Sequence, residues 1–346
     1  LLGRERVAQA LRPRGCPGLD RLREERVAVR VTVIGGGSWG TAFSVVLRDR
    51  GHDVTLACRD EGHAAEITAT AHNPRYLSSV DLKGIAATTV GMAPIETANL
   101  VVVAVPSTAF GTAVADLPGT CPILSLTKGL DPTTGNRLST LVTSRPVAVL
   151  SGPNIAEEIS RGLPAAAVIA GDDRALAVQI QLAITSPTFR VYVNDDIAGV
   201  ELCAAAKNVI ALAAGGADGL GLGDNAKAAL VARGLAEMGR FAEASGAKPE
   251  TFAGLAGMGD LIVTCWSKSG RNRRAGELIA QGATPDEARA QIGMVVEGLT
   301  TAPVLRDLSR SLEIEMPITE GVCSVLDGVP LSELVASLMQ RDPTSE

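Results

Sequence analysis

The sequence predicts an α/β protein whose N-terminal part forms a doubly wound parallel sheet and whose C-terminal part is all-α. Two observations lead to this fold class. Short apolar runs alternate with helix-length segments between residues 29 and 194, as βαβ crossovers require. After residue 194 these runs stop, and Ala- and Leu-rich segments of helical period follow. The core must be aliphatic, because aromatic residues make up only 3% of the chain.

Seven apolar segments have the composition of strands. Residues 100–105 form a continuous apolar run that stops at Pro106, which is typical of a strand covered on both faces. The expected strands are residues 29–34, 52–58, 100–105, 123–126, 147–150, 165–170 and 189–193. Helix-length segments at residues 41–50 and 173–185 lie between them and supply the crossovers.

Six segments after residue 194 have a helical period. They are residues 197–214, 227–244, 274–280, 285–292, 301–311 and 331–339. Gly215 follows the first of them in the position of a C-terminal cap. We therefore expect an α/β domain at residues 29–194 and a helical domain at residues 195–340. Residues 1–28 are rich in arginine and in turn-forming Pro and Gly, and we expect them to be a disordered extension.

Composition and charge exclude several classes of protein. The net charge of −6 argues against a nucleic-acid-binding protein, which normally carries a basic surface. The three histidines lie within the first 72 residues, so the second domain has no histidine for catalysis, and we expect no metal site. No apolar run reaches the roughly 20 residues of an integral membrane helix. Six scattered cysteines without a C-x-x-C pair indicate reduced thiols and a cytoplasmic protein.

A glycine-rich loop follows the first expected strand. Its sequence, Gly35-Gly36-Gly37-Ser38-Trp39-Gly40, has the G-x-G-x-x-G spacing and precedes a helical segment. In this spacing the first glycine makes the turn, the second lets the backbone approach a pyrophosphate, and the third allows helix and strand to close. The phosphate charge then meets the helix N-terminus. Gly35, Gly37 and Gly40 therefore predict a Rossmann-type dinucleotide site rather than an ordinary turn.

The end of the second expected strand indicates which dinucleotide binds. An acid there binds the ribose 2′-hydroxyl of NAD, whereas an arginine accommodates the 2′-phosphate of NADP. Here the strand ends Cys58-Arg59-Asp60-Glu61. Because Arg59 comes before the acids, NADP is favoured over NAD, with use of both as the alternative. A shift of one residue would instead place Asp60 on the ribose.

Polar residues also follow the later strands, at the sheet edge where open α/β proteins bind ligands. Lys128 brings a cation, while Gly152 and Asn154 offer a close backbone approach and a side-chain amide. Taken singly, each is better explained as an ordinary loop lysine or turn residue. Their grouping at one edge favours a ligand site.

Lys207 lies on the apolar face of the helix expected at residues 197–214, with Asn208 beside it. Burial lowers the pKa of a lysine and suits it to act as a general base near neutral pH. The alternative is a lysine whose aliphatic stem runs along small alanines to water. Because this half of the chain has no histidine, Lys207 becomes the candidate base.

Four cations stand at the expected start of a later helix without an intervening acid: Lys268, Arg271, Arg273 and Arg274. Cations oppose the dipole at a helix N-terminus, so an anionic ligand would turn this arrangement into a binding site. A solvated basic turn is the alternative. Upstream, we expect Gly257-Met258-Gly259-Asp260 to be a flexible loop whose carboxylate orients a base or binds a hydroxyl group.

Together these segments resemble the bacterial-type NAD(P)-dependent glycerol-3-phosphate dehydrogenase family. The resemblance extends from about residue 31 to residue 338, and the order of its short motifs makes it specific. In the first half the motifs are Gly35-Gly36-Gly37-Ser38-Trp39-Gly40-Thr41-Ala42, Thr127-Lys128-Gly129-Leu130 and Ser151-Gly152-Pro153-Asn154-Ile155-Ala156-Glu157-Glu158. In the second half they are Glu201-Leu202-Cys203-Ala204-Ala205-Ala206-Lys207-Asn208-Val209, Gly257-Met258-Gly259-Asp260-Leu261, Arg271-Asn272 and Val295-Val296-Glu297-Gly298.

The resemblance implies a role for each matching residue. Lys207 would be the proton acceptor, and Lys128 would touch both the cofactor and the substrate. The nucleotide would be bound by Ser38, Trp39, Arg59, Ala156, Arg271, Val295 and Glu297. Glycerol 3-phosphate would be bound by Gly152, Asn154, Asp260, Gly270, Arg271 and Asn272.

One of these positions departs from the family pattern. The family usually has Ser before the Arg-Asn pair, where this chain has Gly270. A backbone N–H can still reach a phosphate there, but a hydroxyl group is lost. We therefore expect somewhat weaker substrate binding.

The implied reaction transfers a hydride from C2 of glycerol 3-phosphate to the dinucleotide while Lys207 takes the proton of the C2 hydroxyl. The reverse reaction, reduction of dihydroxyacetone phosphate, would supply glycerol 3-phosphate for phospholipids. Two alternatives remain at this point. One is a β-hydroxyacid dehydrogenase, whose carboxylate substrate the arginine cluster would bind, and the other is a non-catalytic dinucleotide sensor. A homodimer is compatible with the sequence, which does not itself define the assembly.

Overall fold

The computed structural model describes residues 28–339, which divide into two compact units. Unit 1 consists of the residues up to Thr127 together with residues 138–197, and unit 2 consists of residues 128–137 together with those from Ala198 onward. Residues 128–137, which the sequence pattern places in the α/β domain, therefore belong to the helical unit. The expected extension at residues 1–28 lies outside the described residues, apart from Ala28.

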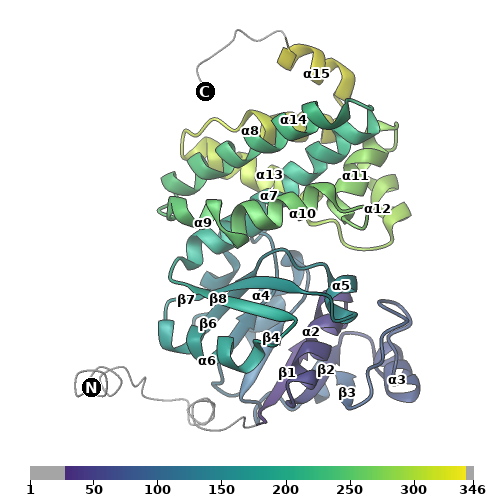
Figure 1. The fold of residues 1–346 in the computed structure, drawn as a ribbon, viewed down its shortest axis with the longest axis vertical. Coiled ribbons are helices and arrows are strands. Elements are labelled where there is room, and N and C mark those ends of the chain that lie inside the picture. Colours follow the sequence, from purple (N-terminus) through teal and green to yellow (C-terminus); the bar gives the residue numbers. More distant parts are fainter. Residues whose placement is uncertain (1–27, 340–346) are drawn as a thin grey trace, which may run out of the picture. The chain divides into compact units, whose positions relative to one another are not determined.

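Unit 1 is built on one sheet of eight strands in the order β3-β2-β1-β4-β5-β6-β7-β8 (Figure 1). The strands are β1 (Arg30–Ile34), β2 (Asp53–Cys58), β3 (Ile85–Thr89), β4 (Leu100–Val103), β5 (Ile123–Ser125), β6 (Val147–Ser151), β7 (Ala165–Gly171) and β8 (Phe189–Asn194). Neighbouring strands are parallel except β6 and β7, which pair antiparallel. The predicted fold class is confirmed, although the sheet is mixed and contains β3, which the apolar pattern does not mark.

Helices cover both faces of this sheet, which explains why the central strands β1, β4 and β5 are almost entirely buried. Val33 and Ile34 are neighbours on β1, yet they belong to two different hydrophobic cores. On one face Phe43 of α2 is fully buried, and on the other Phe110 of α4 is fully buried. The helices of unit 1 are α2 (Ser38–Asp49), α3 (Glu61–Thr70), α4 (Ser107–Ala115), α5 (Ala156–Ser160) and α6 (Arg174–Ile184).

Unit 2 is helical and is organised around the long, buried helix α7 (Ile197–Gly219). The other helices are α8 (Gly223–Ala244), α9 (Pro249–Ala253), α10 (Asp260–Trp266), α11 (Arg271–Ala280), α12 (Pro285–Ile292), α13 (Glu297–Ser311), α14 (Pro317–Leu326) and α15 (Leu331–Met339). A single π-helical turn, η4 (Leu255–Gly259), precedes α10. The expected all-α architecture of this part is therefore confirmed.

The expectation that Gly215 caps the first helix of unit 2 is wrong, because α7 continues to Gly219. Glycine is required at position 215 for packing instead. A Cβ atom there would lie 1.8 Å from the carbonyl oxygen of Arg273 on α11. On the facing helix, a Cβ atom on Gly276 would lie 1.9 Å from the carbonyl oxygen of Leu212. The backbones of α7 and α11 thus approach more closely than any side chain would allow.

This contact leads to a prediction about stability. We expect Gly276→Ala to lower the free energy of unfolding by more than about 2 kcal/mol, because the added methyl group overlaps backbone atoms that cannot move independently. Gly239→Ala is the matched control: Gly239 also lies inside a helix, and a Cβ atom there meets no atom within 4 Å. The control should be neutral or stabilising by up to about 1 kcal/mol. Urea denaturation of both variants measures the difference, and equal stabilities would contradict the packing argument.

Candidate active site

The glycine-rich loop of unit 1 has the geometry of a phosphate-binding turn. Gly35 has a φ of +119°, and a Cβ atom on it would lie 2.3 Å from the carbonyl oxygen of Ala104. A Cβ atom on Gly40 would lie 1.9 Å from the carbonyl oxygen of Gly35. Gly37 differs from these two, because a Cβ atom there would meet nothing within 4 Å. The protein packs against Gly35 and Gly40, while the space beside Gly37 is open to a ligand.

The start of α2 fits the pyrophosphate of a dinucleotide. Ser38 and Trp39 are its first two residues, its first turn has no acidic residue, and no side chain caps its N-terminus. The N–H groups of this first turn can therefore hydrogen bond to phosphate oxygens. The indole Nε1 of Trp39 is buried and has no hydrogen-bond partner among the described residues. A buried donor without an acceptor is expected where a ligand supplies the missing partner.

Asn73 is a residue of this region that the sequence analysis missed. It is fully buried, and its Nδ2 donates to the carbonyl oxygen of Gly36 at 2.9 Å and to Oγ1 of Thr41 at 2.8 Å. Its Oδ1 lies 2.8 Å from Nε2 of His63. These bonds tie the glycine-rich loop to the segment after α3. No sequence motif signals the contact, because Asn73 lies 37 residues from Gly36.

The residues that follow β2 have distinct surroundings. Arg59 is exposed. Asp60 is the N-cap of α3 and accepts the backbone N–H of His63 at 2.8 Å. Asp60 also pairs with Arg75 at 2.8 Å. The hydrogen bond from His63 and the charge of Arg75 hold the pKa of Asp60 below its usual value, despite some desolvation.

Two further candidates in unit 1 lie just after β6. Gly152 has a φ of +143°, and a Cβ atom on it would lie 3.0 Å from the carbonyl oxygen of Ala166. Asn154 donates from Nδ2 to that same carbonyl oxygen at 3.1 Å, while its Oδ1 is buried without a partner among the described residues. Ala156, the first residue of α5, is buried. Asn154 therefore presents a second unsatisfied polar atom.

Unit 2 contains a buried charged centre formed by two lysines and one aspartate. Nζ of Lys207 donates to Oδ1 of Asp260 at 2.8 Å, and Nζ of Lys128 donates to Oδ2 of Asp260 at 2.7 Å. Nζ of Lys207 also donates to Oγ1 of Thr264 at 2.8 Å. The side chains of Lys207 and Asp260 are 6% and 2% exposed, and that of Lys128 is 16% exposed. Each carboxylate oxygen thus binds a different ammonium group.

Burial and charge shift both ionisation equilibria in this centre. Burial lowers the pKa of Lys207 to about 8, although Asp260 opposes the shift and the nearby Lys128 adds to it. Burial alone raises the pKa of Asp260, but the charges and hydrogen bonds of Lys128 and Lys207 outweigh it and lower that pKa. Asp260 therefore stays ionised while Lys207 titrates near neutrality, the condition for a general acid or base.

The expectation that residues 257–260 form a flexible loop is wrong. The π-helical turn η4 runs directly into α10, and Asp260, the first residue of α10, is 1% exposed. A Cβ atom on Gly257 would lie 2.2 Å from the carbonyl oxygen of Phe252, so the turn packs tightly against α9. Thr264 follows Asp260 by one helical turn, so the two side chains lie on the same face of α10. The sequence analysis missed Thr264 because it expected a loop and not a helix at Asp260.

Asn272 is buried, and its side chain already hydrogen bonds to other protein groups. Nδ2 of Asn272 donates to Oδ1 of Asn208 at 2.8 Å, and its Oδ1 accepts the backbone N–H of Gly298 at 2.9 Å. Asn272 therefore joins α11 to α7 and to the start of α13. Val295 and Glu297 flank the N-cap of α13; Val295 is 43% exposed and Glu297 is the first residue of the helix.

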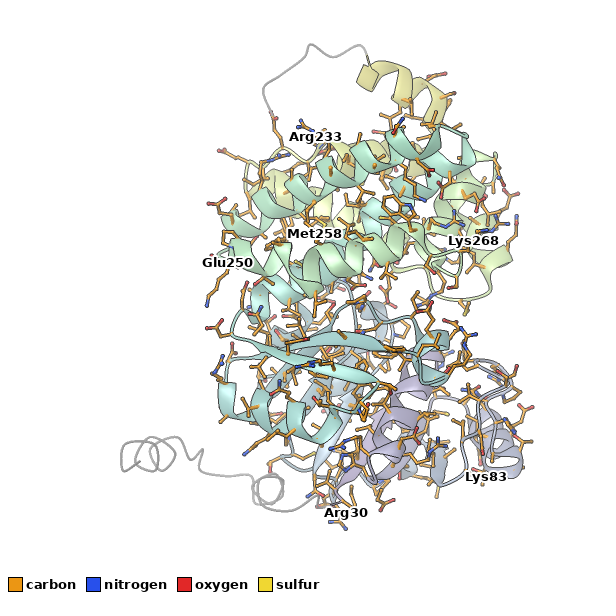
Figure 2. The ribbon with its side chains drawn as sticks, viewed as in Figure 1. Arg30, Lys83, Arg233, Glu250, Met258 and Lys268 are labelled. Carbon is orange, nitrogen blue, oxygen red and sulfur yellow. The ribbon has the colours of Figure 1, made fainter. Side chains whose placement is uncertain are left out.

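Ion pairs engage two cations of the basic cluster at the start of α11. Arg273 pairs with Asp218 at 2.6 Å, and Arg274 pairs with Glu277 at 2.9 Å. Two of the four cations at this predicted anion site are therefore already paired with acids outside the basic stretch. Lys268 and Arg271 line a hollow of about 530 Å³ at the N-terminus of α11, and Lys268 is labelled in Figure 2. Gly270 is the N-cap of α11 and provides no capping side chain.

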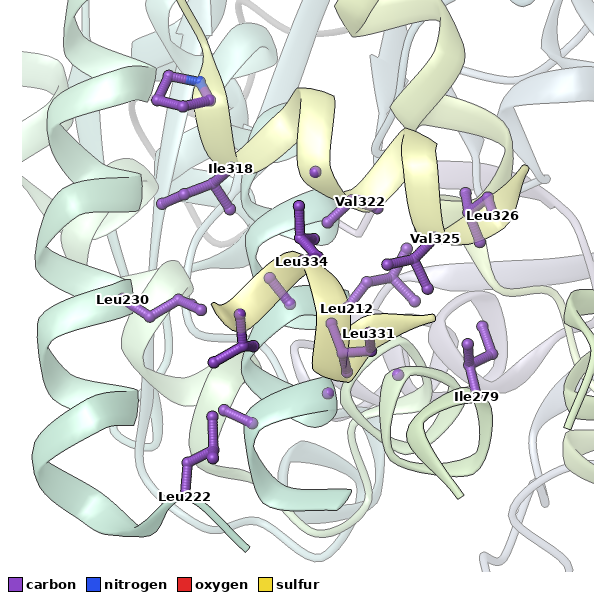
Figure 3. Close-up of a pocket in the computed structure, with 17 residues that line it drawn as sticks. Leu212, Leu222, Leu230, Ile279, Ile318, Val322, Val325, Leu326, Leu331 and Leu334 are labelled. Carbon is purple, nitrogen blue, oxygen red and sulfur yellow. The ribbon is translucent and has the colours of Figure 1, made fainter. Parts of the chain in front are cut away.

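A second hollow in unit 2, of about 670 Å³, is lined by none of the candidate site residues. Aliphatic side chains and glycines line it, among them Leu212 of α7, Leu230 of α8, Val322 of α14 and Leu331 of α15 (Figure 3). No titratable side chain lies in its wall. Catalysis requires polar groups, so the candidate site is the charged centre and not this apolar hollow.

Two further findings concern metals and membranes. Within residues 28–339, no three His, Cys, Asp or Glu side chains gather in a group that could hold a metal ion. Within the same residues, α7 is the one helix long and apolar enough to cross a membrane, and most of it is buried inside the protein. Core helices of water-soluble proteins pass the same test of length and composition.

Comparison with known proteins gives consistent matches along the chain. Residues 30–177 match the family model described as NAD-dependent glycerol-3-phosphate dehydrogenase N-terminus, and residues 196–336 match the corresponding C-terminus model. A glycerol-3-phosphate dehydrogenase (NAD(P)+) of Moorella thermoacetica is 46% identical over 325 residues, which cover 91% of this chain and 97% of the relative. A relative of the same name from Nocardia farcinica is 44% identical and covers 90% of this chain and 98% of its own.

Solved structures agree with these matches. The crystal structure of glycerol-3-phosphate dehydrogenase from Coxiella burnetii has a TM-score of 0.87 and 36% identity, with 91% of this chain and 99% of the other covered. The glycerol-3-phosphate dehydrogenase structure from Saccharomyces cerevisiae has a TM-score of 0.77 and 26% identity, with 91% and 100% covered. The similarity therefore includes both units.

Proposed function

The chain belongs to the NAD-dependent glycerol-3-phosphate dehydrogenase family, and from this premise we propose how its residues carry out the reaction. The enzyme interconverts sn-glycerol 3-phosphate and dihydroxyacetone phosphate by hydride transfer with NAD or NADP, and it supplies glycerol 3-phosphate for phospholipid synthesis. The bound nicotinamide supplies or accepts the hydride. The protein must therefore bind two anionic molecules and move one proton.

We propose that unit 1 holds the dinucleotide. The turn made by Gly35, Gly37 and Gly40 and the free N-terminus of α2 support a pyrophosphate position there. The unsatisfied indole N–H of Trp39 and the exposed Arg59 support contacts to the nucleotide and a preference for NADP. By family resemblance the other cofactor contacts are Ser38, Lys128, Ala156, Arg271, Val295 and Glu297.

Lys207 is our candidate for the proton acceptor, and the observation that carries this proposal is its buried pair with Asp260. A neutral amine at Nζ would take the C2 hydroxyl proton during oxidation, and an ammonium would return it during reduction. Asp260 and Thr264 fix the position of Nζ with two hydrogen bonds. Lys128, bound to the other oxygen of Asp260, adds a positive charge that favours an anionic substrate.

The N-terminus of α11 is our candidate for the substrate phosphate. Its first N–H groups have no side-chain cap, and the guanidinium of Arg271 is exposed beside them. Asn272 would contribute its backbone N–H group, because its side chain is already bound to Asn208 and Gly298. Gly270 remains a substrate candidate by family resemblance, although its own N–H donates to the carbonyl oxygen of Ser267 at 3.0 Å. Gly152 and Asn154 remain substrate candidates of unit 1, the latter through its unsatisfied Oδ1.

We also propose a cytoplasmic location and a homodimeric assembly. The five described cysteines are free, and four of them are buried, which suits a reducing compartment. Sedimentation velocity on the purified protein tests the assembly directly.

For the proposed reaction, the first prediction concerns the proton acceptor. Lys207→Met keeps the length and packing of the side chain but removes its amine, so we expect kcat for dihydroxyacetone phosphate reduction to fall about 10²–10⁴-fold. Calorimetric titration should show NADPH binding within about twofold of the parent protein, which corresponds to less than about 0.5 kcal/mol. Turnover close to that of the parent protein would remove Lys207 from this role.

The second prediction concerns pH. Because the pKa of Lys207 is lowered to about 8, its amine is neutral above that pH and protonated below it. The rate of glycerol 3-phosphate oxidation should therefore rise through about pH 8, and the rate of reduction should fall through the same range. Asp260→Asn removes the charge that opposes the shift, so both inflections should move to lower pH. Inflections that stay in place in this variant would argue against Lys207 as the titrating group.

The third prediction concerns the phosphate. Arg271→Ala should raise KM for dihydroxyacetone phosphate at least about tenfold, the effect of losing one charge-assisted hydrogen bond. Arg289→Ala on α12 is the control, since Arg289 is exposed and pairs only with Asp286 of its own helix among the described residues. Steady-state kinetics of both variants make the comparison. An unchanged KM in Arg271→Ala would move the phosphate site elsewhere.

A further inference from the structure

The acid at the end of β2 is already engaged by the protein. Oδ1 of Asp60 accepts both the backbone N–H of His63 and Nη2 of Arg75, each at 2.8 Å. An acid that selects NAD at this position does so by hydrogen bonding to the ribose hydroxyls. Asp60 instead caps α3, and Arg75 neutralises its charge. This arrangement removes the repulsion that a free carboxylate would exert on a 2′-phosphate.

A buried frame keeps Arg75 at this position. Asn73, two residues before it, is fully buried and bonds to the carbonyl oxygen of Gly36, to Oγ1 of Thr41 and to Nε2 of His63. The segment that carries Arg75 is therefore attached both to the glycine-rich loop and to α3. These bonds fix the backbone from which the Arg75 side chain extends, and the bond to Asp60 places its guanidinium beside the end of β2.

Arg75 has unused binding capacity. Its side chain is 51% exposed, and the bond to Asp60 uses one of the five N–H donors of a guanidinium. Arg59 adjoins Asp60 in sequence and is also exposed. The charges of Arg59 and Arg75 balance those of Asp60 and of the exposed Glu61 that follows it. An anion here would therefore be bound through hydrogen bonds from the guanidinium groups and not through a net positive charge. Two guanidinium groups beside one engaged acid are suited to a phosphate dianion.

We propose that Arg75 is a second specificity residue for NADP, binding the 2′-phosphate together with Arg59 while it continues to neutralise Asp60. The inference rests on the proposed NADP preference. It explains how Asp60 can follow Arg59 without cancelling the attraction of Arg59 for the 2′-phosphate. Arg75 would contact the adenosine end of the cofactor only. Its loss should therefore weaken NADPH binding and leave NADH binding unaffected.

A double-mutant design separates a direct contact from neutralisation of Asp60. Asp60→Asn removes the charge but keeps a good N-cap residue, so α3 should be preserved. In this background Arg75→Ala should raise the Kd of NADPH about tenfold, the effect expected for one charge-assisted contact at a half-exposed site. The Kd of NADH should stay within about twofold. Calorimetric titration of the full chain with each nucleotide gives both values without requiring turnover.

Lys83→Ala is the matched control, because Lys83 is an exposed cation of the same connection between α3 and β3 and is labelled in Figure 2. It should leave both Kd values unchanged. An unchanged Kd for NADPH in Asp60→Asn/Arg75→Ala would overturn the proposal. An equal rise for both nucleotides would also overturn it, since that result indicates a structural role.

The same titrations distinguish this inference from the function on which it rests. If Arg59→Ala keeps the parent ratio of NADPH to NADH affinity while Arg75→Ala loses it in the Asp60→Asn background, the role proposed for Arg59 fails and that of Arg75 stands. If Arg59→Ala loses the preference and Arg75→Ala keeps it in the Asp60→Asn background, the reverse holds. Absence of turnover with dihydroxyacetone phosphate would refute the reaction and leave the binding result for Arg75 in force.

Discussion

The chemistry of this protein depends on one buried carboxylate that binds two ammonium groups. Asp260 alone would be neutral in so buried a place, and Lys207 alone would lose its proton well below its ordinary pKa. Together with Lys128 they form a centre with one negative and two positive charges when Lys207 is protonated. The excess positive charge favours an anionic ligand, and loss of a single proton from Lys207 restores neutrality. In the proposed reaction, binding of the anionic substrate and proton transfer are therefore linked through the same three side chains.

The helix that carries Lys207 packs backbone to backbone against α11 in unit 2. Lys207 and Asn208 lie on α7, whose C-terminal part has glycines that face α11. The contact at Gly215 and Gly276 brings α11 near enough for Asn272 to reach Asn208. The N-terminus of α11 is thereby fixed relative to the helix that carries the candidate base. A larger side chain at either glycine would separate two groups whose relative position matters to about 1 Å for catalysis.

Sequence patterns predicted what depends on local order and missed what depends on distant contacts. Local patterns predicted the strands and helices, the turn at Gly35–Gly40 and the apolar surroundings of Lys207, because neighbouring residues define each of them. They did not predict the end of α7, because Gly215 resembles a helix cap and only the proximity of Arg273 shows why glycine stands there. Three contacts that define the site join residues far apart in the sequence. Asn73 bonds to Gly36 across 37 positions, Arg273 pairs with Asp218 across 55, and Lys128 bonds to Asp260 across 132. A single sequence contains no local sign of such pairs.

Hydrogen bonding divides the candidate site residues into those already bound by protein groups and those with a buried atom still unpaired. The side chains of Asp260, Asn272 and Asn73 already bind protein groups, so their contribution is to hold neighbouring atoms in place. Nε1 of Trp39 and Oδ1 of Asn154 are buried without a protein partner, although native proteins rarely leave such atoms unsatisfied. Both lie directly after strands of the sheet in unit 1, at the edge where α/β proteins bind ligands. In the proposed complex the cofactor or the substrate would supply these partners, and binding would then gain the free energy of two buried hydrogen bonds.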